Sequence, residues 1–433
     1  MTAVDYRAFL ESKTAGAELQ GKPCDVNSVH SFLFDWQKRI VVWAVERGRS
    51  AMWADTGLGK TVMQVEWARL SGETCLIVAP LAVTAQTCRE AAEHLDLTIR
   101  YVRSSAEVTG PGIWVTNYER VRDFDAGMFD AVVLDESSIL KQSDGKTRTM
   151  LIEHFRDVPY RLSCTATPAP NDPEELCNQA EFLGRSTRVN MLSAYFIHDS
   201  DEGWRLKGHA RAPMFRWMSS WAVAIRRPSD LGYADDGYIL PGLNIEPHYV
   251  DVPIEQDGQL FPTDLGGVGG RAQVRRETLQ ARCERAAALV NAEPNEPWLV
   301  WCGLNDEADL LAKLIPGAVN VRGSMSAEDK AAAFLGFADG DVATLITKPS
   351  LAAFGLNWQH CARMVFVGLN DSYESYYQAI RRCYRFGQTR IVDVHIVLSE
   401  LESQIAENVR KKERTADRTA AEMVAAMREG ADW

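Results

Sequence analysis

The chain has 433 residues and a net charge of −12, which predicts two or three domains and excludes both a single small module and a surface coated in basic charge. Hydrophobic residues make up 46% and charged residues 24%, a globular composition that is neither disordered nor collagen-like. One basic groove on an acidic body is enough to bind nucleic acid, so that class of partner remains open.

The nine cysteines form no C-x-x-C pair, and several lie in apolar runs such as residues 75–78. This usage is typical of reduced core cysteines rather than of a disulfide framework or a zinc site. The chain begins without a basic segment followed by an apolar one, and no apolar run approaches the roughly 20 residues that span a bilayer. We therefore expect a cytoplasmic protein.

The first region of regular elements covers residues 34–183, where short apolar runs alternate with helical patterns. The expected strands are 50–53, 74–79, 112–116, 131–135 and 161–165, and the expected helices include 61–70 and 83–95. This alternation predicts a parallel sheet with helices on both faces.

A glycine-rich segment, Ala-Asp-Thr-Gly-Leu-Gly-Lys-Thr at 54–61, follows the first strand and begins a helix, as a phosphate-binding loop requires. Lys60 would reach the β- and γ-phosphates, and Thr61 would hold Mg²⁺. The strict pattern begins with Gly where this chain has Ala54, so a chance glycine-rich turn is the alternative. The predicted ATP contacts are Thr56, Gly57, Leu58, Gly59, Lys60 and Thr61.

The strand at 131–135 ends in two carboxylates, Asp135 and Glu136. By itself such a pair is more often a solvent-facing strand end. Together with the loop upstream, it predicts that Asp135 coordinates Mg²⁺ and that Glu136 polarises the attacking water.

Residues 190–230 are rich in Trp, Arg and His, and a Gly-rich hinge at 266–270 follows a Pro- and Gly-bearing stretch at 241–262. Basic residues here are candidates for DNA backbone contacts, with a solvated surface as the equal alternative: Arg205, Lys207, Arg211, Arg226 and Arg227. The tryptophans Trp204, Trp217 and Trp221 are expected in a helical core rather than stacked on bases.

A second alternating region covers residues 298–397, with strands expected at 298–302, 319–321, 342–347, 363–367 and 392–397. Near its end, a helical pattern puts Gln378, Arg382 and Arg385 on one face, where arginines suit contact with a γ-phosphate. The alternatives are a solvated basic face or a DNA phosphate contact. The tail, residues 399–427, predicts one long amphipathic helix.

In their order along the chain, these segments resemble the superfamily 2 helicases and translocases of the DEAD/DEAH type, most closely the Swi/Snf-like branch. The matching segments are 56–61 (motif I), 76–81 with Gln86 (Ia), 116–119 (Ib), 135–136 (II), 163–168 (III), 354–359 (V) and 378–388 (VI). Gln37 lies where this family keeps an adenine-reading glutamine. The chain looks like a compact prokaryotic or phage-type member, which would place it in a prokaryotic or phage-infected host cytoplasm.

The resemblance implies an α/β fold of two tandem RecA-like lobes with ATP and Mg²⁺ in the cleft between them. The expected divisions are an N-terminal extension 1–27, lobe 1 at 28–189, a small, mostly helical insertion with the hinge at 190–285, lobe 2 at 286–398 and a C-terminal helix at 399–433. Motif V adds Gly355 and Asn357 to the ATP contacts, and Arg382 and Arg385 become arginine fingers. Motif III, with Ser163, Thr165 and Thr167, couples the ATP site to DNA, and motif Ib offers Thr116 and Asn117 to the DNA.

Two positions depart from the family pattern: Ser138 replaces a histidine that links motifs II and III, and Arg381 stands where the branch usually has Gly. The implied activity is that of a DNA-dependent ATPase, a monomeric motor that moves on double-stranded or branched DNA. A strand-separating DNA or RNA helicase is one alternative. A non-catalytic DNA-binding scaffold is another, which intact Lys60, Asp135 and Glu136 disfavour.

Overall fold

The computed structural model describes residues 18–141, 145–199, 203–250, 276–351, 357–370, 372–399 and 403–430. The chain divides into two compact units. The first combines Met1–Asp236 with Glu413–Trp433, and the second is Gly237–Lys412. Both have a parallel sheet with helices on its two faces, which confirms the predicted α/β architecture.

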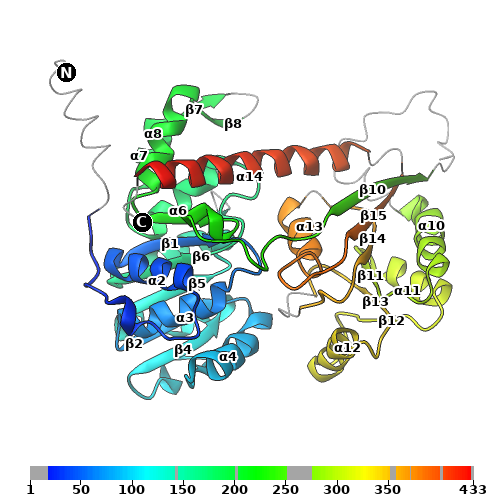
Figure 1. Cartoon of the computed structure of the whole chain (residues 1–433), viewed down its shortest axis with the longest axis horizontal. Helices are drawn as coiled ribbons and strands as arrows, with labels where there is room; N and C mark the ends of the chain where they lie inside the picture. The colour runs from blue at the N-terminus through cyan, green and yellow to red at the C-terminus, as the bar shows by residue number, and fades with distance from the viewer. Residues whose placement is uncertain are drawn as a thin grey trace. The chain divides into compact units, whose positions relative to one another are not determined.

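The first unit is built on a seven-stranded parallel sheet in the order β3-β4-β2-β5-β6-β1-β9. Figure 1 labels β1, β2, β4, β5 and β6 of this sheet. Its strands are β1 (Arg49–Ala54), β2 (Thr74–Ala79), β3 (Arg100–Tyr101), β4 (Gly112–Asn117), β5 (Ala131–Asp135), β6 (Tyr160–Cys164) and β9 (Ala222–Ile225). The central strand β5 is buried at every residue, as expected for a strand covered on both faces.

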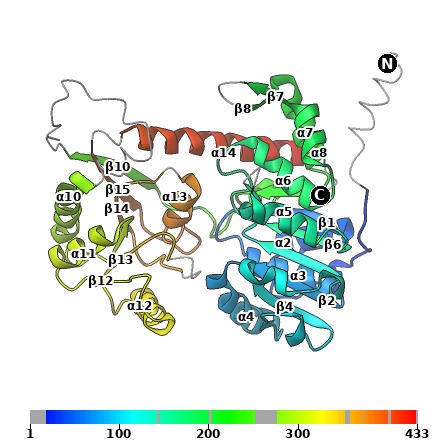
Figure 2. The same cartoon turned by 180° about the vertical axis from the view of Figure 1, so that it is seen from behind.

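Helices cover both faces of this sheet. On one face α2 (Asp35–Arg47), α3 (Lys60–Ser71) and α4 (Leu81–Leu95) pack side by side. On the other, α5 (Lys146–His154) and α6 (Leu176–Phe182) share a core with Leu76 and Val132 of the sheet (Figure 2). Alternate strand residues point to opposite faces, so each strand contributes to both cores.

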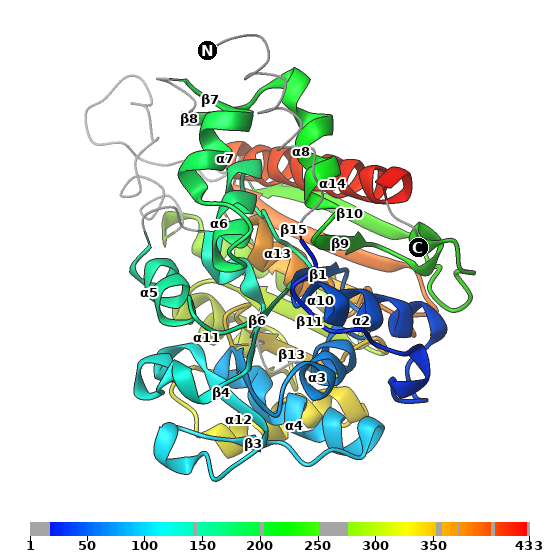
Figure 3. The same ribbon diagram turned by 90° about the vertical axis from the view of Figure 1, so that its left-hand side faces the viewer.

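Residues 190–236 belong to the first unit, which corrects the predicted insertion between lobes. The segment contains α7 (Arg188–Tyr195), the antiparallel hairpin β7 (Phe196–Asp199) and β8 (Gly203–Leu206), and α8 (Arg211–Met218). It then enters the main sheet, because β9 pairs in parallel with β1 (Figure 3). Trp221 is fully buried, and Trp204 and Trp217 pack partly buried against the same core, as predicted for the tryptophans.

The second unit has a six-stranded parallel sheet in the order β10-β15-β14-β11-β13-β12. Its strands are β10 (Leu243–Val250), β11 (Trp298–Cys302), β12 (Val319–Asn320), β13 (Thr344–Thr347), β14 (Arg363–Val367) and β15 (Val392–Ser399). β10 lies within the Pro- and Gly-bearing stretch, in which no strand was predicted, and it forms an edge of the sheet with alternating exposed and half-buried residues.

In the described part of the second unit, two helices lie on each face of the sheet. On one face α10 (Leu279–Ala292) and α11 (Asn305–Leu314) pack on aliphatic strand residues. On the other, α12 (Ala327–Asp339) and α13 (Tyr373–Ile380) meet an aromatic layer in which Trp358 packs against Trp301, Phe334 and Phe337.

The C-terminal helix α14 (Ser403–Gly430) confirms the single long helix predicted for the tail. Met423 and Ala426 join the core of the first unit. Arg428 donates to the carbonyl oxygens of Ser229 and Asp230 at 2.7 and 3.1 Å. Among the described residues, no helix is both long and apolar enough to cross a membrane.

Candidate functional site

Three adjacent strands of the first unit carry the predicted ATP-binding segments at their carboxyl ends, on the same side of the sheet. β6 lies between β5 and β1, and all run parallel. The glycine-rich loop follows β1, Glu136 follows β5 and Thr165 follows β6. Since ligands bind at the carboxyl ends of parallel strands, this edge is the candidate site.

The glycine-rich loop has a backbone that only glycine adopts without strain at two positions. Gly57 has φ 84° and Gly59 has φ 74°. The Lys60 ammonium group donates to the carbonyl oxygens of Ala54 at 2.9 Å and Asp55 at 3.4 Å, so its side chain folds back over the loop. Thr61 is half-buried in the first turn of α3, where backbone N–H groups and the helix dipole favour an anion.

Gln37 holds this loop from α2. Its side chain is 4% exposed, its Nε2 donates to the Leu58 carbonyl oxygen at 3.0 Å, and its Oε1 accepts from the Phe34 N–H at 2.9 Å. A Cβ at Gly59 would lie 2.5 Å from Nε2 of Gln37. Gln37, for which the family resemblance predicts adenine contact, therefore braces the glycine-rich loop in this structure.

The two carboxylates at the end of β5 differ in environment. Burial, followed by the nearby charge of Glu136, raises the pKa of Asp135 to about 7, while the charge of Lys60 acts in the opposite direction. Glu136 has φ 54°, a left-handed conformation that is costly for a residue with a side chain and is often found at functional sites. Tyr118 donates to the Asp135 carbonyl oxygen at 2.6 Å and supports this turn.

Motif III contacts motif II through two sets of hydrogen bonds. Thr165 Oγ1 donates to Glu136 Oε2 at 3.3 Å and also accepts from the Thr167 N–H at 3.1 Å. Ser137 and Ser163 share a hydrogen bond of 2.9 Å between their hydroxyl groups. Motifs II and III are thus linked without a histidine.

Ser138, the residue at the histidine position, donates to the neighbouring Glu136 carbonyl oxygen at 3.4 Å. The adjacent Ser137, rather than Ser138, contacts motif III, through its hydrogen bond with Ser163. Gln179 on α6 extends this network, since Ser163 donates to its Oε1 and its Nε2 donates to the Ser137 carbonyl oxygen at 3.0 Å.

Sequence reasoning missed Gln64 as well as Gln179. Gln64 lies one turn after Lys60 and is fully buried, and no hydrogen-bond partner for either amide atom is found among the described residues. It nevertheless lies close enough to Asp135 to lower the pKa of that carboxyl. The i, i+4 spacing from Lys60 on α3 was the available sequence signal.

The residues around this edge fit a nucleotide with Mg²⁺. A carboxyl whose pKa is raised by burial and by a second carboxylate is one that a bound cation stabilises in its charged form. The start of α3 after the glycine loop and the nearby Lys60 ammonium group offer positive charge and N–H donors to phosphate oxygens. Thr61 and Asp135 would hold the ion, and Lys60 the phosphates.

Several of the predicted DNA contacts have partners within the first unit, and Arg227, although exposed, lies 3.7 Å from Asp235. Thr116 is fully buried and donates to the Val102 carbonyl oxygen at 2.8 Å, and Asn117 accepts from the Tyr101 hydroxyl at 2.6 Å. Arg211 forms an ion pair with Glu422 at 2.6 Å. Lys207 is half-buried, and three of the candidates remain exposed: Arg205, Arg226 and Arg227.

The predicted helix at motif VI is shorter than expected. α13 ends at Ile380, so Gln378 lies on the helix while Arg382 and Arg385 lie in the turns that follow. The Arg382 carbonyl oxygen accepts from the Trp358 N–H at 2.9 Å, a contact that replaces helical hydrogen bonding. The expected single helical face for these three side chains is therefore wrong.

Gln388 shapes the turns that present both arginines, each of which is half-buried. Its buried Nε2 donates to the carbonyl oxygens of Cys361 at 3.0 Å and Cys383 at 3.3 Å. Its Oε1 accepts from two backbone N–H groups, those of Thr389 and Arg390. Asn357 of motif V is exposed, and Gly355 lies outside the described residues.

Comparison with known proteins gives one family match. Residues 281–387, which run from α10 through motif VI, match the model described as "Helicase conserved C-terminal domain". The match covers most of the second unit's strands and helices and ends at Gly387.

Two examples illustrate the known proteins to which this chain is similar. One is the Mus musculus "DNA annealing helicase and endonuclease ZRANB3", 28% identical over 169 residues that form 35% of this chain and 16% of that protein. The chain therefore matches about a sixth of that relative's length. The other is a solved structure, "Sulfolobus solfataricus SWI2/SNF2 ATPase core in complex with dsDNA", at 16% identity and a TM-score of 0.44, covering 95% of this chain and 99% of that one.

Proposed function

Because the chain resembles the Swi/Snf-like branch of the superfamily 2 helicases, we propose that it is an ATP-dependent motor that moves on double-stranded or branched DNA. The observation that carries this proposal is the strained Glu136 backbone beside the glycine-rich loop, with Thr165 hydrogen-bonded to the carboxylate. A residue held in a left-handed conformation at such an edge serves a function that outweighs its cost.

In this proposal, the site residues of the first unit divide the work of binding and hydrolysing ATP. Lys60 and the loop N–H groups bind the phosphates, and Gln37 reads the adenine next to the loop that it braces. Mg²⁺, when bound, neutralises charge on the transferred phosphoryl group. Glu136 orients the attacking water, and Thr165 keeps the Glu136 carboxylate aimed at it.

The second unit provides the positive charge. Arg382 and Arg385 would contact the γ-phosphate when the two units close on the nucleotide, and Gln378 would assist them. Movement along DNA would follow from repeated closure, with the network of Ser137, Ser163 and Gln179 reporting the state of the ATP site to α6. We place this motor in the cytoplasm, as a monomer, under the same proposal.

The experiment compares ATP hydrolysis by the wild type and by Glu136→Gln in the presence of duplex DNA, forked DNA, single-stranded DNA, RNA or no nucleic acid. The matched control is Glu153→Gln, which changes an exposed carboxylate on α5, outside every assigned motif of the same unit. Duplex or forked DNA should stimulate hydrolysis by the wild type and the control. Glu136→Gln should lose activity while it still binds nucleotide, since the loop and Lys60 are untouched.

Other patterns of stimulation would favour the alternatives. Stimulation mainly by single strands or RNA would indicate a strand-separating helicase. An absence of hydrolysis under every condition, with intact DNA binding, would contradict the motor and indicate a scaffold.

A further inference from the structure

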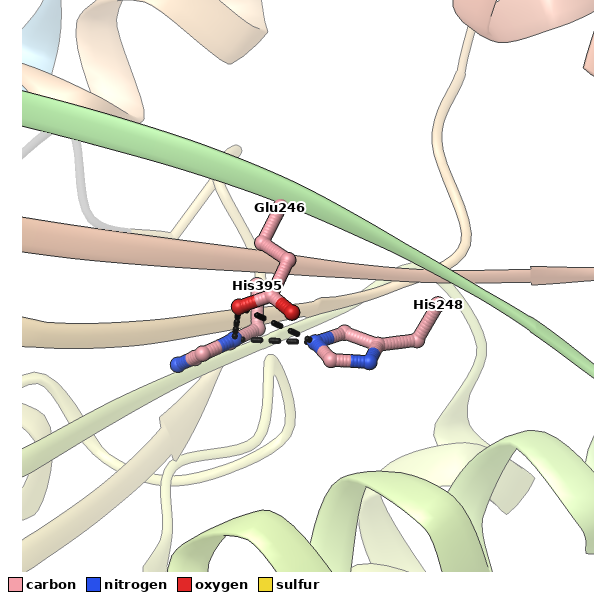
Figure 4. Close-up of side chains that lie close together, drawn as sticks. All are labelled: Glu246, His248 and His395. Carbon is pink, nitrogen blue, oxygen red and sulfur yellow. Dashed lines mark hydrogen bonds and ion pairs between the residues drawn. The ribbon is translucent and has the colours of Figure 1, made fainter.

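Three side chains that could bind a metal ion converge in the second unit, outside every motif discussed above. Glu246 and His248 extend from β10, and His395 extends from β15 (Figure 4). One ligand atom from each lies within 4.8 Å of the other two. The two histidines are 147 positions apart in the chain.

The sheet register brings these side chains together. Residues two apart on a strand share a face, so Glu246 and His248 point to the same side of β10. In the parallel ladder, Glu246 is directly opposite His395. The ring of Trp298 stacks on His395 with 5.8 Å between centroids, which restricts the imidazole. The site is therefore built by backbone pairing and packing rather than by chance contact of flexible residues.

The distances suit a small divalent ion. Nε2 of His248 lies 2.9 Å from Nδ1 of His395, and the Glu246 Oε2 lies 3.6 Å from the latter and 4.0 Å from the former. Zinc bonds of about 2.0–2.1 Å in a tetrahedron separate neighbouring ligand atoms by about 3.3 Å, close to these values. We propose that Glu246, His248 and His395 form a site for a divalent transition metal, with zinc the best match and its fourth position open to water.

Burial prepares the imidazoles for this role. The side chains of His248 and His395 are 10% and 14% exposed, while Glu246 is 64% exposed and gives access from solvent. Burial lowers the pKa of both imidazoles, with Arg285 adding to the effect at His248. Neutral rings carry the lone pairs that metals bind.

The guanidinium group of Arg285 opposes metal binding at this site. The Arg285 Nη2 lies 3.0 Å from Nδ1 of His248, and a guanidinium group can only donate. In the metal-free protein Nδ1 therefore accepts, and the His248 proton is on Nε2, pointing at His395. Metal binding to Nε2 requires that proton to move to Nδ1, which ends the hydrogen bond from Arg285. Arg285 is exposed and free to turn into solvent, so it weakens metal binding without preventing it.

A bound ion would fasten the edge strand β10 to β15 through side chains in addition to the backbone ladder. Binding to the folded state alone stabilises the second unit by mass action. The expected consequence is structural, and it does not depend on ATP hydrolysis by the first unit.

The test titrates Zn²⁺ into chelator-treated full-length protein by calorimetry, with Co²⁺ as a spectroscopic probe of coordination. The wild type should bind one equivalent and melt at a higher temperature with the metal. His248→Gln/His395→Gln should lose binding by more than the roughly 10–100-fold that loss of an outer partner costs. Circular dichroism of each variant checks that it is folded.

Arg285→Ala provides the second, independent measurement. Because it removes the competing cation, it should tighten zinc binding by about tenfold, a change of the size typical for partners of metal ligands. The matched control is Arg276→Ala, which removes the same charge from another exposed position just before α10 and should leave affinity unchanged. Zinc bound equally well by the double histidine variant, no zinc bound by the wild type, or no tightening in Arg285→Ala would each overturn the proposal.

Discussion

Replacement of Gly59 by Ala tests how the glycine-rich loop is held. The added Cβ would lie 2.5 Å from the Gln37 Nε2 and force this side chain away from its two hydrogen bonds. The left-handed backbone, φ 74°, adds a cost of about 1 kcal/mol for a residue with a Cβ. Two lost hydrogen bonds at about 1 kcal/mol each bring the total to about 3 kcal/mol.

Gly232→Ala is the matched control in the same unit. Gly232 has φ 81°, and no atom lies within 4 Å of the added Cβ, so only the backbone cost of about 1 kcal/mol applies. In thermal melts, Gly59→Ala should lower the midpoint of the first unit by about 6–12 °C, and Gly232→Ala by about 2–4 °C.

The double variant Gly59→Ala/Gln37→Ala isolates the contact. Once Gln37 is truncated, the methyl group at Gly59 meets no amide, so its further cost should fall to about 1 kcal/mol. Equal melting temperatures for Gly59→Ala and Gly232→Ala would refute the close packing of Gln37 on the loop, as would full additivity in the double variant.

Three further predictions concern single side chains. The Asp135 pKa of about 7 exceeds its ordinary value of 3.8, so without nucleotide the first unit should lose stability as pH rises from about 4 to 7, and Asp135→Asn should reduce that loss in melts across this range. Gln388→Ala removes four hydrogen bonds and should destabilise the second unit by about 3–4 kcal/mol in urea unfolding, whereas Gln280→Ala on an exposed face should not; equal effects would contradict the anchoring role. Glu307→Gln should cost about 3–5 kcal/mol because it removes the carboxylate that pairs with the buried Arg282 guanidinium group, and Arg282→Met in that background should recover part of the loss in the same measurement.

The strands were readable from sequence because a strand buried on both faces is a short, nearly continuous apolar run. β2, β5, β11 and β14 agree with the expected ranges at both ends. The loop after β1 and the carboxylates after β5 were predicted from their residue patterns, and the parallel sheet brings both to the carboxyl ends of its strands.

β9 was missed because its four residues lie within the Trp- and Arg-rich segment. They show no alternation of apolar and polar residues that would indicate a strand. Only the pairing with β1, more than a hundred residues upstream, makes them a strand. The same reason moves residues 190–236 from an insertion into the first unit.

The motif VI helix was predicted too long because helical spacing alone does not report where carbonyl groups find other donors. The Trp358 N–H and the Gln388 amide take the carbonyl oxygens of Arg382 and Cys383, which ends helical bonding. Similarly, the Ser137–Ser163 hydrogen bond and the Glu246, His248 and His395 cluster depend on neighbouring strands, and no local pattern shows them.

The measurement that tests the central claim most directly is displacement of a third strand from a DNA triplex, since a motor that moves along the duplex removes it without separating the duplex. The wild type with ATP and Mg²⁺ should displace the strand at a rate that falls with its distance along the duplex from the entry point. Glu136→Gln should not displace it. Hydrolysis stimulated by duplex DNA without displacement at any distance would contradict translocation.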